Sequence, residues 1–100
     1  MATTSKVLFR GAASISNTTL YTVPSATTTI VTNIGIANTA ASAATATLKL
    51  DGVDIVTDVA LAANSTTFID LKQVISATEV IEGSASAITV NFHVSGVEVA

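Results

Sequence analysis

Apolar and polar residues alternate one by one along much of this sequence, and that period of two constrains the fold more than any other feature. Between Ala44 and Leu50 every second residue is apolar, and threonines and a lysine fill the positions between. Because successive side chains of a strand point to opposite faces, this pattern predicts a half-buried β-strand. Asp51-Gly52 follows at once, and Asp-Gly between alternating runs predicts a type I′ hairpin. The chain is therefore expected to fold as antiparallel strands joined by tight turns.

The residue composition also favours sheet over helix. Valine (12), isoleucine (9) and threonine (17) make up 38 of the 100 residues, whereas leucine occurs only six times. Branching at Cβ fits a pleated, half-buried sheet better than a helix. Charged residues are 11% of the chain, against about 25% in an ordinary domain. The polar surface is therefore expected to consist of Thr, Ser and Asn, and so neutral a surface indicates contact with neighbouring molecules.

Alternation and turn residues divide the rest of the chain into short strands. The remaining strands are expected over residues 6–10, 20–23, 28–37, 53–63, 66–71, 79–82 and 88–95. Asp70 could cap one helical turn within 70–75, the only helix that the pattern allows. Together these elements predict an all-β antiparallel β-sandwich or jelly roll of about eight short strands. Residues 1–17 are expected to form an N-terminal arm or first short strand, and residues 18–100 the β-sandwich domain.

The parity of the strands predicts which side chains face the core. Ile30, Ile34 and Ile36 are expected to share the buried face of one strand, and Phe68 is also expected in the core. In the last strand the expected core residues are Ile88, Val90, Phe92 and Val94. After Gly96 the apolar residues change parity, which predicts a β-bulge at this glycine that turns the faces of the strand over.

Candidates for catalysis or metal binding are few. His93, the only histidine, falls on the polar face of the last strand, where a solvated or interface role is favoured over catalysis or metal binding. Asp51, Asp54 and Asp58 lie in and after the predicted hairpin, but their spacing is not that of a helix–loop–helix calcium site. Solvated carboxylates at a hairpin tip are the favoured interpretation.

Other ligand signatures are missing from the sequence. Glu79 and Glu82 lie three residues apart in an expected strand and so face opposite ways, which does not suit a catalytic carboxylate pair. Five scattered glycines form no phosphate loop, and four aromatic residues are too few for a stacking platform. Only four Lys and Arg residues argue against nucleic-acid binding, and no apolar run suits a signal peptide or a membrane span. We therefore expect no enzyme activity, no cofactor, no metal site, no nucleic acid and no membrane partner.

Four segments of the chain carry a resemblance to a known class of proteins. In order they read LYTVPSATTTIVTNIGIANT, ATATLKLDGVDI, VALAANSTTFIDLKQVI and SASAITVNFHVSGVEV. In this order they resemble small β-sandwich virion proteins of tailed bacteriophages, of the head-decoration (cement) type. The resemblance covers residues 18 to 99, the scale of one domain. Residues 1–17 match no part of the pattern.

The resemblance implies a structural protein that binds the assembled head lattice and stabilises it. Such proteins commonly form homotrimers, so the implied partners are the major capsid protein, or another virion protein, and further copies of this chain. The implied location is the virion, assembled in the host bacterial cytoplasm, with which the absence of cysteine and of a signal peptide agrees. A tail, neck or fibre component of the virion is the alternative, followed by a cellular ligand-binding β-sandwich module.

The N-terminal segment contains the residues expected to make the capsid or subunit contact. Val7, Leu8, Phe9 and Ile15 would be costly to leave exposed on an arm. Termini also stay disordered unless they are tied down. With Arg10, these residues are therefore predicted to touch the shell or a neighbouring subunit.

Overall fold

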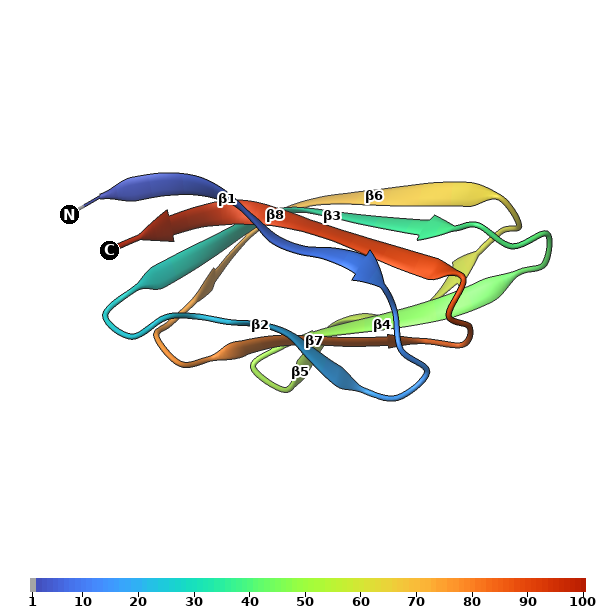
Figure 1. Ribbon diagram of the computed structural model, residues 1–100, viewed down its shortest axis with the longest axis horizontal. Coiled ribbons are helices and arrows are strands. Elements are labelled where there is room, and N and C mark those ends of the chain that lie inside the picture. Colours follow the sequence, from blue (N-terminus) through green and yellow to red (C-terminus); the bar gives the residue numbers. More distant parts are fainter. Residues whose placement is uncertain (1) are drawn as a thin grey trace.

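Two four-stranded antiparallel sheets lie face to face and make up an all-β sandwich (Figure 1). The computed structural model describes residues 2–100, among which there is no helix and hence none that could cross a membrane. The strands are β1 (Thr3–Ala12), β2 (Thr18–Thr22), β3 (Thr28–Asn38), β4 (Ala44–Leu50), β5 (Val53–Leu61), β6 (Ser65–Ile75), β7 (Val80–Ala85) and β8 (Val90–Val99). The helical turn allowed within 70–75 is wrong, because β6 continues through that segment alongside β3.

The strand pairing is that of a long hairpin folded back on itself. β4 pairs with β5, β3 with β6, β2 with β7 and β1 with β8, so each pair encloses the one before it. Two further pairs, β3 with β8 and β4 with β7, roll this ribbon into two layers. Sheet A then has the order β1-β8-β3-β6 and sheet B the order β2-β7-β4-β5. This is the eight-stranded jelly roll, so the expected fold class is confirmed.

The turns follow the residue chemistry that their backbone needs. Asp51 and Gly52 both have positive φ, 52° and 77°, as the type I′ hairpin between β4 and β5 requires. Asn64, with φ of 52°, lies in the turn before β6. Asp58 has φ of 43° and lies where the register of β5 against β4 shifts, so β5 is interrupted there by a bulge.

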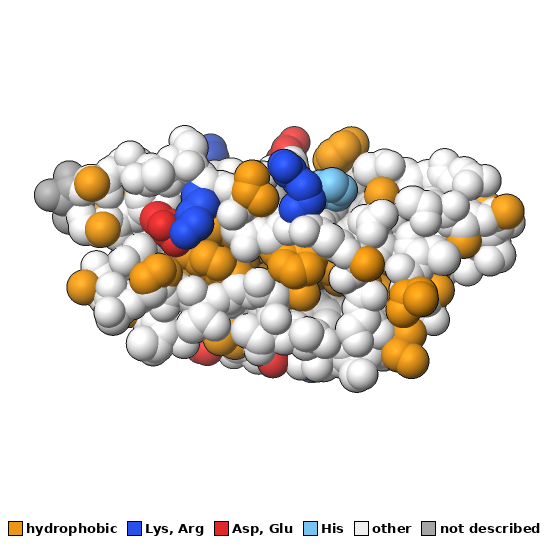
Figure 2. All heavy atoms as spheres, in the orientation of Figure 1, with side chains coloured by type: hydrophobic (Ala, Val, Ile, Leu, Met, Phe, Trp, Pro, Cys, Tyr) orange, Lys and Arg blue, Asp and Glu red, His pale blue; other side chains and the backbone are white. Residues whose placement is uncertain are grey.

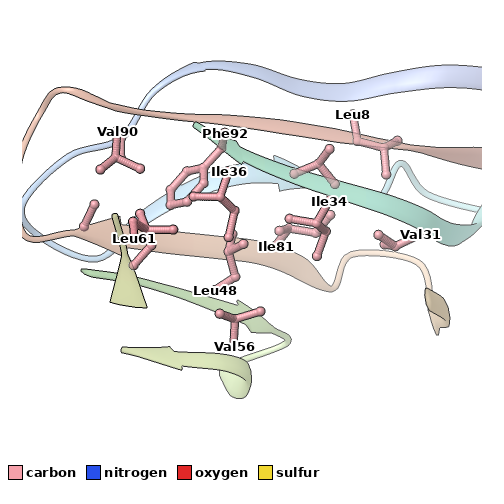
Figure 3. Packing of buried hydrophobic residues seen from close by; sticks show 14 of the residues in the cluster. Leu8, Val31, Ile34, Ile36, Leu48, Val56, Leu61, Ile81, Val90 and Phe92 are labelled. Atoms are coloured by element: carbon pink, nitrogen blue, oxygen red, sulfur yellow. The ribbon is translucent and has the colours of Figure 1, made fainter. Parts of the chain in front are cut away.

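The core lies between the two sheets, where side chains from both interdigitate (Figure 3). Val90, Phe92 and Val94 of β8 are fully buried, as their parity predicts. The largest buried side chains that they meet include Ile34, Ile36, Leu48, Leu61 and Ile81. In β7 the missing side chain of Gly83 gives room to these neighbours, since a Cβ there would lie 2.9 Å from Leu48 Cδ2 and 3.1 Å from Phe92 Cε2.

Two residues expected in the core lie at the surface. Ile88 is 69% exposed, because it belongs to the connection between β7 and β8 and β8 begins only at Val90. Phe68 is 71% exposed, because it projects from the outer side of β6. Its ring lies on Gly35 of the neighbouring strand β3, where a Cβ would be 3.1 Å from Phe68 Cε1.

One residue of β3 is extra in the ladder with β8. Val31 pairs with Gly96 and Asn33 pairs with Ser95, which leaves Thr32 without an opposite residue. A bulge of this kind changes which alternate positions face the core. The positions of β3 that face the core are accordingly odd-numbered before Thr32 and even-numbered after it, while Gly35 is buried on the outer face by the Phe68 ring.

The expectation for Ile30 is therefore wrong, while Ile34 and Ile36 are buried as predicted. The bulge expected at Gly96 is also misplaced. Every residue of β8 from 91 to 99 keeps a partner in β1, and the extra residues lie in the two flanking strands, at Leu8 of β1 and Thr32 of β3. Gly96 is required for another reason, since a Cβ there would be 2.2 Å from the carbonyl oxygen of Ile30.

The N-terminal strand β1 is hydrogen-bonded along β8 and forms one edge of sheet A. Its pairing continues to the end of the chain, where the backbone N–H of Ala2 donates to Ala100 O at 2.9 Å and that of Ala100 donates to Ala2 O at 2.8 Å. The two termini therefore lie side by side, as Figure 1 shows. Residues 13–17 connect β1 to β2 at the opposite end of the sandwich.

Candidate interaction surface

The outer face of sheet A has an apolar stripe across three of its strands near the chain termini. Ile30 on β3 pairs with Val97 on β8 and with Val74 on β6, so these three side chains form one row. Val99 follows two residues after Val97 and continues the row on the same face. Val74 is 64% exposed, and the other three are partly exposed. We call Ile30, Val74, Val97 and Val99 the apolar stripe.

The bulges in the flanking strands explain why these residues point outward. At this end of sheet A the inward positions of β3 belong to Thr29 and Val31, both fully buried, which leaves Ile30 outside. In β8 the inward positions belong to Gly96 and Glu98. The parity change after Gly96 was visible in the sequence. It arises because β8 keeps the same alternation of faces to its end, so Val97 and Val99 point away from the core.

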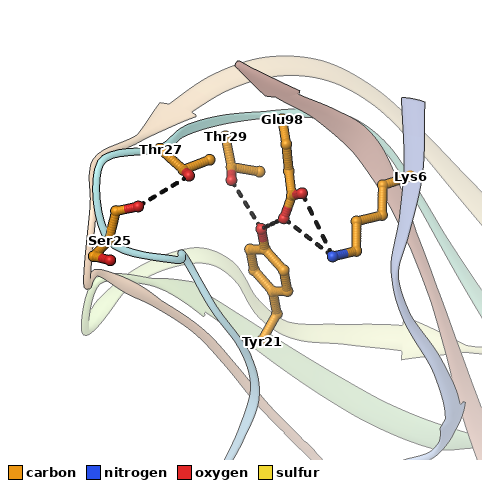
Figure 4. Close-up of polar contacts among 6 residues, drawn as sticks. All are labelled: Lys6, Tyr21, Ser25, Thr27, Thr29 and Glu98. Atoms are coloured by element: carbon orange, nitrogen blue, oxygen red, sulfur yellow. Dashed lines mark hydrogen bonds and ion pairs between the residues drawn. The ribbon is translucent and has the colours of Figure 1, made fainter. Parts of the chain in front are cut away.

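A polar cluster lies beneath the stripe, on the inner side of the same end of the sandwich (Figure 4). The Tyr21 hydroxyl of β2 donates a hydrogen bond to Glu98 Oε2 of β8, and it lies 2.9 Å from Thr29 Oγ1 of β3. Lys6 Nζ of β1 lies 3.3 Å from Glu98 Oε2 and completes an ion pair at the surface. Side chains of four strands from both sheets are thus linked through the Tyr21 hydroxyl and the Glu98 carboxylate.

The ionisation of this cluster follows from its contacts. Burial and the hydrogen bond to Glu98 raise the pKa of Tyr21 above its ordinary value. The hydrogen bond from Tyr21 lowers the pKa of Glu98, and Lys6 acts in the same direction. Both shifts favour a neutral tyrosine beside a charged carboxylate, the states in which the hydrogen bond forms. We call this contact between Tyr21 of sheet B and Glu98 of sheet A the interlock between the sheets.

The other end of the outer face of sheet A carries a second group of exposed side chains. Arg10 pairs with His93, His93 with Gly35 and Gly35 with Phe68, so this row crosses all four strands. Phe68 is the only large apolar side chain in it. His93 is exposed on the face away from the core, where its parity placed it. The row holds one imidazole and no neighbouring carboxylate in register.

The outer face of sheet B is different in character. Its outward positions on β4 are Thr45, Thr47 and Lys49, and on β7 they are Val80, Glu82 and Ser84. These alternate with buried alanine, leucine, isoleucine and glycine. Figure 2, which views the sandwich along the edge formed by β1 and β2, shows few charged side chains and a line of hydrophobic atoms between the two layers. Of the two outer faces, that of sheet A is the one with an apolar stripe.

The residues predicted to make the contact lie in different environments. Leu8 is buried and belongs to the core, and Phe9 packs against that core. Val7 and Arg10 are exposed on β1. Ile15 is exposed in the connection between β1 and β2, at the far end from the termini. The segment therefore offers Val7, Arg10 and Ile15 to a neighbour, while Leu8 holds β1 to the sandwich.

The acidic residues noted in the sequence are partly brought together. Asp51 lies beside Glu79, and the interaction with the Glu79 carboxyl group raises the pKa of Asp51. Asp54 accepts a hydrogen bond from Thr57 and lies 3.9 Å from Lys49 Nζ. In residues 2–100 no group of three or more His, Cys, Asp or Glu side chains is arranged to hold a metal ion.

Comparison with known proteins gives relatives in structure but none in sequence. No protein family of known sequence pattern matches the chain, and no curated protein matches it. The chain superposes over 97% of its length on a chain of the T13 IBDV viral particle, with a TM-score of 0.56 and 10% identity. It superposes equally fully on an exo-beta-1,3-galactanase from Phanerochaete chrysosporium, with a TM-score of 0.50 and 13% identity.

These similarities concern the fold. The chain spans only 30% of the viral-particle chain and 29% of the galactanase. A third structure, the sugar-binding C-terminal domain of EclA, gives a TM-score of 0.47 at 18% identity. A β-sandwich of similar fold thus forms part of a viral-particle chain and part of an enzyme, and the fold alone does not distinguish such roles.

Proposed function

We propose that this protein is a structural component of a virion, specifically a head-decoration protein of a tailed bacteriophage that acts as a homotrimer. The observation that carries the proposal is the apolar stripe of Ile30, Val74, Val97 and Val99 on the outer face of sheet A. Contiguous apolar side chains at the surface of a folded domain mark sites of contact with other molecules. A virion protein spends its functional life covered by neighbours, which accounts for such a surface.

The distribution of exposed apolar side chains also favours a bridging role. The stripe lies on sheet A near the termini, whereas Ile15 and Ile88 are exposed in connections at the other end of the sandwich. In Figure 2 hydrophobic atoms gather at the lower right, where Figure 1 places these connections. A protein that joins adjacent lattice subunits needs at least two separate contact surfaces, and exposed apolar side chains at two ends of the sandwich support this role.

The mechanism is mechanical. Each copy binds the assembled lattice but not the free capsid subunit, so binding stabilises the assembled state by mass action. The sandwich suits this task because its termini are tied together and its sheets are interlocked through Tyr21 and Glu98. The major capsid protein is the proposed partner, and the virion is the proposed location.

A tail, neck or fibre component is the second candidate. The same exposed apolar side chains support this candidate. Tail, neck and fibre parts are symmetric assemblies, and their subunits need surfaces for self-association. Copy number separates the two candidates: a decoration protein occupies many lattice positions, and a tail or fibre part only the few set by one symmetry axis.

A cellular ligand-binding module is less well supported. The observation in its favour is Phe68, an exposed aromatic ring in the same row as His93. A single exposed ring offers little stacking area for a sugar. Glycan binding that is lost in Phe68→Ala but kept in Val74→Thr would favour this module over a virion protein.

The experiment that tests the proposal is to purify particles of the phage that encodes the chain and measure its copy number by quantitative mass spectrometry, together with cryo-electron images. We expect many copies per particle, located on the head. Few copies located on the tail would support the second candidate, and complete absence from particles would exclude both.

A further inference from the structure

A groove opens at the edge of the sandwich where β5 ends sheet B and β6 ends sheet A. It encloses about 270 Å³. Its walls include Val53, Ile55 and Val74, whose side chains are exposed despite being aliphatic. Among residues 2–100, no strand pairs with β5 or β6 on the side that borders the groove, so backbone groups of both strands remain open to pairing. We call this the edge groove.

The rim of the edge groove is acidic. Asp51, Asp54 and Glu79 all line it. Lys49 lies 3.9 Å from Asp54 Oδ1, but within residues 2–100 no ion pair involves Asp51 or Glu79. Asp51 and Glu79 line the same groove, and Glu79 accepts a hydrogen bond from the Ser76 backbone N–H at 2.6 Å. Two neighbouring carboxyl groups disfavour each other's charged form, as the raised pKa of Asp51 beside Glu79 indicates, and a cation near them would relieve this repulsion.

We propose that the edge groove binds an extended peptide segment of a protein partner, in which aliphatic side chains alternate with Lys or Arg. The aliphatic side chains would cover Val53, Ile55 and Val74, and the cationic ones would reach the carboxylates of the rim. The charge pattern selects such a segment over an acidic one, because an acidic segment would add like charges to the crowded rim.

An extended conformation fits the site for a geometric reason. The groove runs between two strand edges, and a strand added to a free edge gains main-chain hydrogen bonds while its alternate side chains enter pockets. This inference rests on the proposed function only in naming the partner: the protein that contains the peptide segment would be a virion protein. The affinity for such a peptide is argued from the residues of this chain alone.

The test uses the full-length chain labelled with ¹⁵N and a synthetic hexapeptide probe, acetyl-Val-Lys-Val-Arg-Val-Thr-amide. We expect saturable shifts of backbone amide signals at Val53, Ile55 and Val74, which weaken as salt is raised. A matched peptide with Glu in place of Lys and Arg should leave these signals unmoved. The double variant Asp51→Asn/Glu79→Gln should weaken binding of the basic peptide by about three- to tenfold, the range for one or two exposed charge contacts.

Asp58→Asn is the matched control variant. Asp58 is also an exposed acidic residue with positive φ, but it lies outside the edge groove, so its substitution should leave the affinity unchanged. The proposal is overturned if both peptides bind equally, if neither produces saturable shifts, or if the shifts map elsewhere. Groove signals that shift with protein concentration alone would show that a second copy is the occupant, and this too would overturn it. Since no particles are involved, failure here would leave the proposed virion location untouched.

Discussion

Gly96 determines how closely β3 and β8 can approach at the bulge. A Cβ at this position would lie 2.2 Å from Ile30 O and 3.0 Å from Leu8 Cδ1, and backbone cannot move aside as a flexible side chain can. We expect Gly96→Ala to lower the free energy of unfolding by about 3 kcal/mol, the upper range for overpacking. Gly52→Ala is the control, since nothing lies within 4 Å and only its φ of 77° is unfavourable, which costs about 1 kcal/mol.

Chemical denaturation of both variants measures these differences. The comparison separates the effect of close packing from that of backbone conformation. At Gly96 a side chain would clash with its neighbours, whereas at Gly52 only the positive φ is unfavourable. A Gly96→Ala variant as stable as Gly52→Ala would show that β3 and β8 do not meet at this bulge in the way described.

Tyr21 provides a spectroscopic probe of the interlock between the sheets. It is the only tyrosine, and the chain has no tryptophan, so the absorbance of tyrosinate reports this side chain alone. We expect its pKa to lie above the ordinary value of about 10. Glu98→Gln should lower this pKa, but not to the ordinary value, because burial, the larger cause, remains. Asp70→Asn on β6 should leave the titration unchanged, because Asp70 is not among the groups that shift the pKa of Tyr21. A Glu98→Gln titration identical to wild type would contradict the contact.

The same two shifts fix the sign of the pH dependence. The raised pKa of Tyr21 contributes stability that is complete below the unfolded value and is lost as pH rises through the folded value. The lowered pKa of Glu98 contributes stability that is present above its unfolded value and is lost as pH falls through the folded value. The interlock should therefore weaken at both the acid and the alkaline ends of the pH range.

At the scale of strands, β6 and β8 each present a phenylalanine with opposite roles. Phe92 is fully buried between the sheets, whereas Phe68 lies on Gly35 at the surface. We expect Phe92→Ala to cost about 3–5 kcal/mol of unfolding free energy, and Phe68→Ala about 0.5 kcal/mol, as is usual for surface positions. Equilibrium unfolding of the two variants measures the difference. Equal costs would mean that the assignment of inner and outer faces in one of these strands is wrong.

Strand number, the Asp-Gly hairpin and the inner face of β4 could be predicted because each depends on neighbours in sequence. The outward orientation of Ile30 and Val97 near the bulges could not be predicted in this way. Whether Val97 faces in or out depends on which strand of the ladder has the extra residue, and that is a property of the pairing with Leu8 and Thr32. Phe68 lies outside the core because it pairs with Gly35, an outward position of the neighbouring strand, and this pairing cannot be read from the sequence around Phe68.

The whole molecule is an elongated block of 45 × 21 × 18 Å with two unlike faces. Sheet A has the apolar stripe on its outside, whereas the outer positions of sheet B are largely hydroxyl-bearing and charged residues. If the protein stabilises a head lattice, its docking should depend on sheet A and be indifferent to sheet B. The two sheets offer matched positions for this comparison. In sheet A, Val97 on the central strand β8 and Val74 on the edge strand β6 both pair with Ile30. In sheet B, Thr45 on the central strand β4 pairs with Ala60 on the edge strand β5.

The most direct test of the proposed role is co-sedimentation of purified protein with heads that lack it. Val97→Lys/Val74→Lys places two lysines on sheet A, and Thr45→Lys/Ala60→Lys places two on the paired outward positions of β4 and β5 in sheet B. Both variants should show cooperative thermal unfolding, so that folding is controlled. We predict that the sheet B variant sediments with the heads like wild type and that the sheet A variant stays in solution. A sheet A variant that decorates heads as well as wild type would contradict the assignment of this face as the docking surface.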